Sequence, residues 1–201
     1  QLGKELQSLG DSFLEGRTPA KAGILFDWNN WWALELASGP SKDMDYLKTV
    51  SLYYETLYRQ NIPVDILPYD AEVSSYDLIV APMLYMTKEG VAERLKDFVR
   101  DGGTLVTTVM SGLADENDRC IFGAYPGKLK DLLGIWVEET DALRPYEKNR
   151  MKLSDKLALA KAEYDCGFLC DIIHTEGGAQ VLAAYGEDFY AGCPCVTENS
   201  Y

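Results

Sequence analysis

Apolar residues in the first half of the chain follow two spacings in alternation. Continuous or β-branched apolar runs are typical of buried strands, whereas apolar positions three and four residues apart are typical of amphipathic helices. Strands are predicted at residues 21–27, 62–67, 76–81 and 104–110, and helices at residues 2–14, 41–60 and 88–100. Because strands alternate with helices and the connections are short, we expect a parallel sheet joined by right-handed crossovers.

Residues next to these elements refine the prediction. Ser41 and Thr87 are predicted N-caps of the second and third helices. Pro63 lies near the start of its strand, which favours an edge position because proline has no N–H to donate. The inward face of the second helix is predicted to comprise Tyr46, Leu47, Val50, Tyr54 and Leu57.

The pattern weakens beyond residue 111. A short helix is predicted at 129–133 and strands at 135–138 and 180–185. Residues 151–178 fit both a helix and strands, and we assign them to strands. The chain as a whole is predicted to be an α/β protein, a flavodoxin-like, doubly wound three-layer sandwich with a mainly parallel sheet.

In such a fold the ligand or partner edge lies at the carboxyl ends of the strands. Three loops are predicted to meet there, at residues 27–32, 82–86 and 111–118. The first of them carries Trp28, Trp31 and Trp32. Consecutive tryptophans cannot share one face of a regular element, so at least one of Trp31 and Trp32 is expected to face a sugar, another domain or another subunit.

Composition narrows the function classes. The chain is 47% hydrophobic with a formal net charge of −13, which disfavours nucleic-acid and anionic-membrane binding. It contains no apolar run of the roughly 18 to 20 residues that a membrane span needs. The odd number of cysteines, five, fits reduced thiols in a cytoplasmic protein better than a disulfide framework.

Two kinds of hydrolase chemistry are weighed against these residues. A nucleophile after the fourth strand would be Ser111 on a turn with Gly112, but no cysteine lies there and the sole histidine, His174, is distant in sequence. A glycosidase needs two carboxyls facing one another across the sugar, whereas Asp115, Glu116 and Asp118 are neighbours in one loop. We therefore favour a solvated, salt-bridged loop.

Phosphate and metal sites are weighed in the same way. The tryptophans occupy the position after the first strand where a phosphate-binding fold has glycines. Cys166, Cys170 and His174 are four residues apart, which places them on one face of a single helix or strand, and Cys193 and Cys195 would complete a shell. This spacing matches no common zinc pattern, so we expect no metal.

Several motifs are specific to one family. The chain resembles the middle domain of glycoside hydrolase family 42 β-galactosidases in seven segments that occur in the same order. These are residues 24–35 (ILFDWNNWWALE), 61–65 (NIPVD), 80–86 (VAPMLYM), 102–104 (GGT), 115–119 (DENDR), 125–127 (YPG) and 189–192 (FYAG).

The resemblance implies a fold for this chain and separate roles for the domains of the family's enzymes. In that family a (β/α)8 barrel carries the two catalytic glutamates, and the middle domain is a trimerisation domain with a fold like class I glutamine amidotransferases but without their nucleophile. Residues 1–16 resemble the helix that leads out of the barrel, and residues 17–201 resemble the trimerisation domain, ending before the family's next strand. The chain alone is then expected to bind no cofactor and to have no β-galactosidase activity.

The expected partners are the barrel, neighbouring subunits of a homotrimer and, in the complete enzyme, a galactoside substrate. The predicted interface or active-site wall residues are Asp27, Trp28, Asn30, Trp31, Trp32, Asp115, Glu116, Asn117 and Arg119. The alternative is a stand-alone amidotransferase-like hydrolase or a sugar-binding domain.

Overall fold

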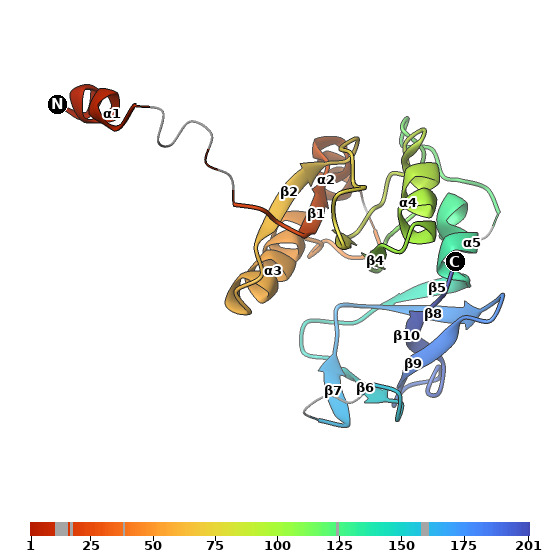
Figure 1. Cartoon of the computed structure of the whole chain (residues 1–201). Helices are drawn as coiled ribbons and strands as arrows, with labels where there is room; N and C mark the ends of the chain where they lie inside the picture. The colour runs from red at the N-terminus through yellow and green to blue at the C-terminus, as the bar shows by residue number, and fades with distance from the viewer. Residues whose placement is uncertain (11–15, 17, 38, 124, 158–160) are drawn as a thin grey trace.

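The computed structural model describes residues 1–10, 16, 18–37, 39–123, 125–157 and 161–201. Helices and a parallel sheet form the first half of the chain, and antiparallel strands form the second half, in cyan to blue below it in Figure 1. The first half contains α1 (Leu2–Leu9), β1 (Ala22–Phe26), α2 (Trp28–Leu36), α3 (Tyr46–Arg59), β2 (Val64–Pro68), β3 (Leu78–Ala81), α4 (Val91–Arg100) and β4 (Thr104–Thr107).

The parallel sheet has the order β2-β1-β3-β4. All four strands predicted in the first half are present, each within a few residues of its expected bounds. The strand β2, which begins directly after Pro63, lies at an edge as predicted. The two central strands, β1 and β3, contribute fully buried residues such as Ile24 and Ile79, in keeping with their uninterrupted apolar sequences.

Helices cover both faces of this sheet. On one face, α4 and α5 (Lys130–Leu133) pack their apolar residues with Leu25 of β1 and Ile79 of β3. On the other face, α2 and α3 pack with Ile24 and Val80. Because successive strand residues point to opposite faces, one short strand serves both layers.

Helix starts differ from the prediction. The segment after β1, predicted as a loop, is the helix α2, with Asp27 as its N-cap. The next helix begins at Tyr46 with Asp45 as its N-cap, while the Ser41 hydroxyl accepts a hydrogen bond from the N–H of Asp43 in a preceding turn. The N-cap of α4 is Gly90, not Thr87. The side chains of Asp27 and Asp45 accept the capping hydrogen bonds of α2 and α3, whereas Gly90 of α4 provides no side-chain cap.

The inward face of α3 also differs from the prediction. Tyr46 and Val50 are buried, and Tyr53 and Leu57 pack partly against the same core. Leu47 and Tyr54, which were expected on that face, are exposed. The true inward stripe therefore follows the spacing i, i+4, i+7, i+11, and a second apolar stripe lies outside it.

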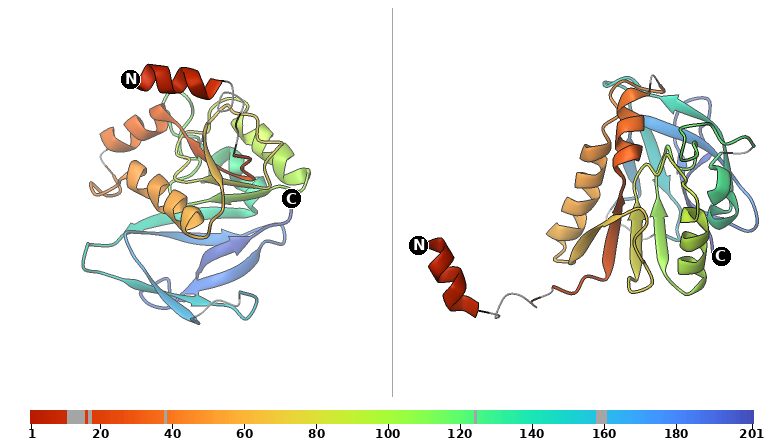
Figure 2. Two further views of the ribbon diagram at one scale, coloured as in Figure 1. Left: turned by 60° about the vertical axis from the view of Figure 1, so that its left-hand side comes forward. Right: turned by 90° about the horizontal axis from the view of Figure 1, so that it is seen from above.

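The first helix, α1, stands away from the rest of the described chain (Figures 1 and 2). It has no buried residue, and its apolar side chains Leu2, Leu6 and Leu9 are exposed. The prediction extends this helix to residue 14, but residues 11–15 lie outside the described part of the chain.

The second half consists of antiparallel strands, so a mainly parallel architecture was wrong for this part. After the short helix η2 (Gly127–Leu129), one sheet has the order β10-β9-β6-β7 and another pairs β5 with β8. The strand assignment within residues 151–178 was right. The strands are β5 (Ile135–Ala142), β6 (Asn149–Leu153), β7 (Glu163–Cys166), β8 (Leu169–Thr175), β9 (Gln180–Tyr185) and β10 (Pro194–Glu198). Among the described residues, no helix has the length and apolar character needed to cross a bilayer.

Candidate subunit-contact site

The three segments predicted to meet at the carboxyl edge of the parallel sheet are joined by hydrogen bonds. The Asn30 side chain donates to the carbonyl of Met83 (2.7 Å) and accepts from the N–H of Met86 (2.9 Å). The N–H of Thr87 in turn donates to the carbonyl of Ala114 (2.8 Å). Asn30 is completely buried, so this predicted wall residue acts by holding the second segment in place.

A buried ion pair lies at the same edge of the sheet. Lys88 Nζ lies 2.8 Å from Oδ1 and 2.7 Å from Oδ2 of Asp27, and both side chains are less than a tenth exposed. The ammonium also lies 3.8 Å from the centre of the Tyr69 ring. Asp27 additionally accepts the N–H of Asn29 (3.3 Å) as the cap of α2. The carboxylate is therefore occupied by contacts within the chain, and Lys88 is a partner that the sequence analysis did not identify.

Tyr46 is hydrogen-bonded to the backbone at Asp27. Its hydroxyl accepts the N–H of Asp27 (3.3 Å) and lies 3.5 Å from the carbonyl of Leu25, to which it donates. Burial raises the pKa of Tyr46 to about 12, so the phenol keeps its proton at neutral pH. These groups lie at the edge where a doubly wound fold commonly binds a ligand, and they are hydrogen-bonded within the chain.

The tryptophans form an exposed surface on α2. Trp28, Trp32 and Leu36 recur every four residues on one side of the helix and are 56%, 53% and 86% exposed. We call these three residues the α2 ridge. Trp31 points to the neighbouring side, packs partly into the core beneath Phe26, and donates its Nε1–H to Glu35 (2.6 Å). The expected division between consecutive tryptophans is present, and Trp32 is the more exposed residue of the pair.

The acidic loop is organised around Asp115. This carboxylate accepts the N–H groups of Asn117 (2.8 Å) and Arg119 (3.0 Å), and the Arg119 guanidinium lies 3.2 Å away. These contacts, the Arg119 N–H first among them, lower the pKa of Asp115. Glu116, Asn117 and Arg119 are exposed. The loop is therefore a self-capped, salt-bridged turn, as favoured above.

Ser111 and His174, which were weighed above as a nucleophile and its base, have other partners. Ser111 Oγ is buried, donates to the carbonyl of Thr108 (2.7 Å) and accepts the N–H of Leu84 (3.2 Å). His174 lies 2.8 Å from a carboxylate oxygen of Glu138 and stacks on Trp136, with ring centres 4.1 Å apart. The Ser111 hydroxyl acts as a structural bridge between two backbone segments.

The cysteines that were weighed as metal ligands lie on different strands. Cys166 ends β7, whereas Cys170 and His174 belong to β8. Among the described residues, no three histidine, cysteine or acidic side chains come together in a way that would hold a metal ion. Cys166, Cys170, Cys193 and Cys195 instead pack in a small apolar cluster with Tyr185 and Tyr190. Burial raises the pKa of Cys166 to about 11 and that of Cys195 to about 12, so both are neutral thiols near pH 7.

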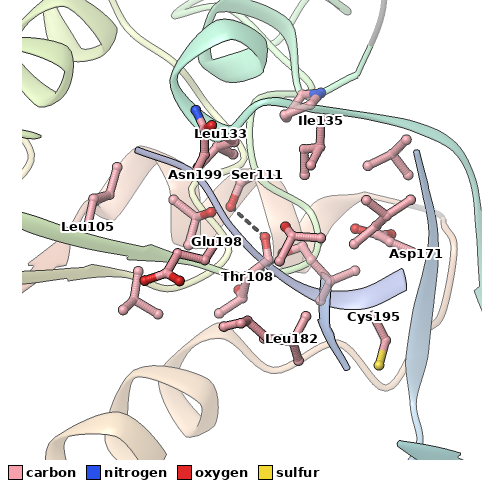
Figure 3. A pocket seen from close by; sticks show the side chains of 18 of the residues that line it. Leu105, Thr108, Ser111, Leu133, Ile135, Asp171, Leu182, Cys195, Glu198 and Asn199 are labelled. Carbon is pink, nitrogen blue, oxygen red and sulfur yellow. Dashed lines mark hydrogen bonds between the residues drawn. The ribbon is translucent and has the colours of Figure 1, made fainter. Parts of the chain in front are cut away.

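A cavity of about 680 Å³ separates β4 from the antiparallel strands (Figure 3). Its lining combines apolar groups such as Leu105 with polar groups that include Thr108, Asp171 and Glu198. The Asp171 carboxylate accepts hydrogen bonds from the hydroxyls of Thr140 (2.6 Å) and Tyr125 (3.2 Å). Burial raises the pKa of Asp171 to about 6.

Comparison with known proteins decides the family. The model of the β-galactosidase trimerisation domain matches residues 20–201. The chain belongs to the β-galactosidase trimerisation domain family. This trimerisation domain is 47% identical over 201 residues to β-galactosidase BgaP of Planococcus sp. (strain L4) and 44% identical over 200 residues to β-galactosidase LacZ of Lactobacillus acidophilus.

Solved structures agree with the sequence relatives. The crystal structure of a β-galactosidase from Bacillus circulans sp. alkalophilus superposes with a TM-score of 0.94 at 48% identity, covering 100% of this chain and 30% of that one. The two curated relatives are likewise matched over 100% of this trimerisation domain, which spans 30% and 29% of their own lengths. The resemblance inferred from the seven motifs is thus confirmed.

Proposed function

We propose that this chain is a non-catalytic oligomerisation domain of a homotrimeric β-galactosidase. The observation that carries the proposal is the match of residues 20–201 to the trimerisation domain family. The reaction, retaining hydrolysis of terminal β-D-galactosides, is assigned to a (β/α)8 barrel outside these 201 residues. On this view the fold is of the class I glutamine amidotransferase type, without a nucleophile.

The geometry of the carboxyl edge supports this division. The polar side chains at this edge bind groups of the same chain: Asp27 pairs with Lys88, and Asn30 and Ser111 form hydrogen bonds with the backbone. The outward surface of this edge combines two aromatic residues, Trp28 and Trp32, with a polar rim formed by Glu116, Asn117 and Arg119. Large aromatic side chains are enriched among the residues that dominate protein interfaces. We assign residues 17–201 to the oligomerisation domain and residues 1–16 to a segment that connects it to the barrel.

The test uses the full-length protein that contains this chain. Replacing Trp28 and Trp32 together with alanine is expected to shift the protein from trimer to smaller species in sedimentation velocity. The matched control is Phe189→Ala, because Phe189 is 74% exposed and lies between β9 and β10 in the second half of the chain. An unchanged trimer in the double tryptophan variant contradicts the assignment of the interface. Turnover of an aryl galactoside by the purified 201-residue chain contradicts its non-catalytic role.

A second function, saccharide binding, is favoured by the cavity beside β4. Its volume of about 680 Å³ lies within the range of small-molecule sites, and its lining contains hydroxyls and carboxylates that suit a sugar. Calorimetric titration of the chain with galactose and with lactose separates the two functions. Saturable heat supports the sugar site, and its absence leaves the oligomerisation role as the sole proposal.

A further inference from the structure

The helix α3 carries an apolar stripe that the described part of the chain leaves exposed. Its inward residues Tyr46 and Val50 are buried against the sheet. On another side Leu47, Tyr54 and Tyr58 recur at the spacing i, i+7, i+11, and they are 39%, 39% and 67% exposed. We call these three residues the α3 stripe. A helix that is apolar on two sides is typically packed against other protein surfaces on both of them.

The α3 stripe is also ordered in a way that suits a contact surface. The rings of Tyr54 and Tyr58 stack on one another, with centres 6.0 Å apart and planes 12° apart. Tyrosine offers a large contact area for the loss of few torsional degrees of freedom. It is also among the residues whose truncation most often weakens protein–protein association.

Symmetry explains why a second surface is needed. A ring of three identical subunits uses a heterologous contact, in which one patch on each subunit meets a different patch on the next. The α2 ridge supplies only one of these patches. The helices α2 and α3 contact each other on the same face of the sheet, so the ridge and the stripe are two different patches on neighbouring elements of each subunit.

We propose that the α3 stripe is the surface that receives the α2 ridge of a second copy of this chain. This inference rests on the proposed trimer and names its complementary patch. Charge supports the pairing: the sole charged residue of α2 is Glu35, whereas α3 carries Lys48 and Arg59 against a single acid, Glu55. The two helices therefore differ in the sign of their net charge, which favours α2 against α3 over α2 against α2.

The test combines two variants of the full-length protein. One variant, Trp28→Ala/Trp32→Ala, lacks the ridge; the other, Tyr58→Ala, lacks the most exposed part of the stripe. Tyr58→Ala is expected to raise the dissociation constant of the assembly by about tenfold or more, the effect of removing an interface anchor. Tyr146→Ala is the matched control, since Tyr146 is 74% exposed on a loop outside α3.

Mixing the two variants separates the pairing from a general loss of assembly. Each variant alone is expected to be monomeric at a suitable concentration. An equimolar mixture retains one intact ridge-to-stripe contact per pair of chains, so heterodimers are expected in sedimentation velocity. A closed ring is not expected, because its next contact would join the missing ridge of one variant to the missing stripe of the other.

The outcomes distinguish this inference from the proposed function. A wild-type protein that is not a trimer overturns both. If Tyr58→Ala, or the more disruptive Tyr58→Lys, leaves the trimer intact while the tryptophan variant dissociates, only the pairing is overturned. The pairing is also overturned if both variants dissociate and their mixture stays monomeric.

Discussion

The ion pair between Asp27 and Lys88 gives the sharpest test of how the carboxyl edge is held together. The ammonium lies within 2.8 Å of both carboxylate oxygens, and the two side chains are 9% and 8% exposed. Replacing Lys88 with methionine keeps most of the apolar stem but leaves a buried carboxylate without its countercharge. Removing one partner of such a pair costs about 3–5 kcal/mol, a large fraction of the 5–15 kcal/mol that stabilises a typical domain.

The measurement is urea unfolding of the chain at neutral pH, followed by tryptophan fluorescence. Lys88→Met is expected to lower the free energy of unfolding by about 3–5 kcal/mol. The double variant Asp27→Asn/Lys88→Met removes the stranded charge and retains an N-cap acceptor for α2, so it is expected to recover at least half of that loss.

A surface pair supplies the matched control. Lys96 lies 3.9 Å from Asp131, whose side chain is 80% exposed. Such pairs contribute about 0–1 kcal/mol, so Lys96→Met is expected to change stability by no more than that. The reasoning is refuted if Lys88→Met destabilises no more than Lys96→Met, or if the double variant is no more stable than Lys88→Met.

Three further predictions concern the second half and the turn that joins it to the sheet. Because burial raises the pKa of Asp171 to about 6 from 3.8, the stability it contributes is fully present below pH 4 and is lost as pH rises through 6. The unfolding free energy of Asp171→Asn minus that of wild type, measured by urea at each pH, should therefore rise by about 3 kcal/mol between pH 3 and pH 8; a flat difference contradicts the shift. Cys120 is exposed, whereas burial raises the pKa of Cys166 and of Cys195. An aromatic disulfide reagent should thus show a fast phase that Cys120→Ser abolishes, with Cys166 and Cys195 reacting only on unfolding. Gly112 has φ +77°, and an added Cβ would clash with the Pro126 carbonyl oxygen. Gly112→Ala should therefore lower the thermal midpoint by several degrees. Gly3→Ala is the control and should not lower it, because a Cβ at Gly3 meets nothing within 4 Å.

The parts of the fold that the sequence predicted are those with strong local patterns. Strands buried on both faces are continuously apolar, which is why β1 and β3 were located closely. Knowing that these strands are parallel was enough to predict that the segments after them meet at one edge, where Asn30 joins Met83 and Met86. The early proline placed β2 at an edge because a central strand needs every N–H.

The parts that were missed lack a local signal. The nine residues of α2 are apolar on several sides, so no helical period stood out and the segment was predicted as a loop. In α3, two apolar stripes lie side by side, and Leu47 and Tyr54 were assigned to the wrong one. The partner of Asp27 is 61 residues away along the chain. A pairing over that separation is determined by the tertiary structure, so the sequence around Asp27 does not predict it.

The Asn30 side chain has a chemical consequence beyond its role in folding. Its Nδ2 must donate to one backbone group and its Oδ1 must accept from another, both without water. Spontaneous deamidation to aspartate would set an oxygen that has no hydrogen to give against the Met83 carbonyl, 2.7 Å away. The same exchange made by mutation, Asn30→Asp, would therefore leave the Met83 carbonyl without its donor, and this variant is expected to unfold at a lower temperature than the wild type.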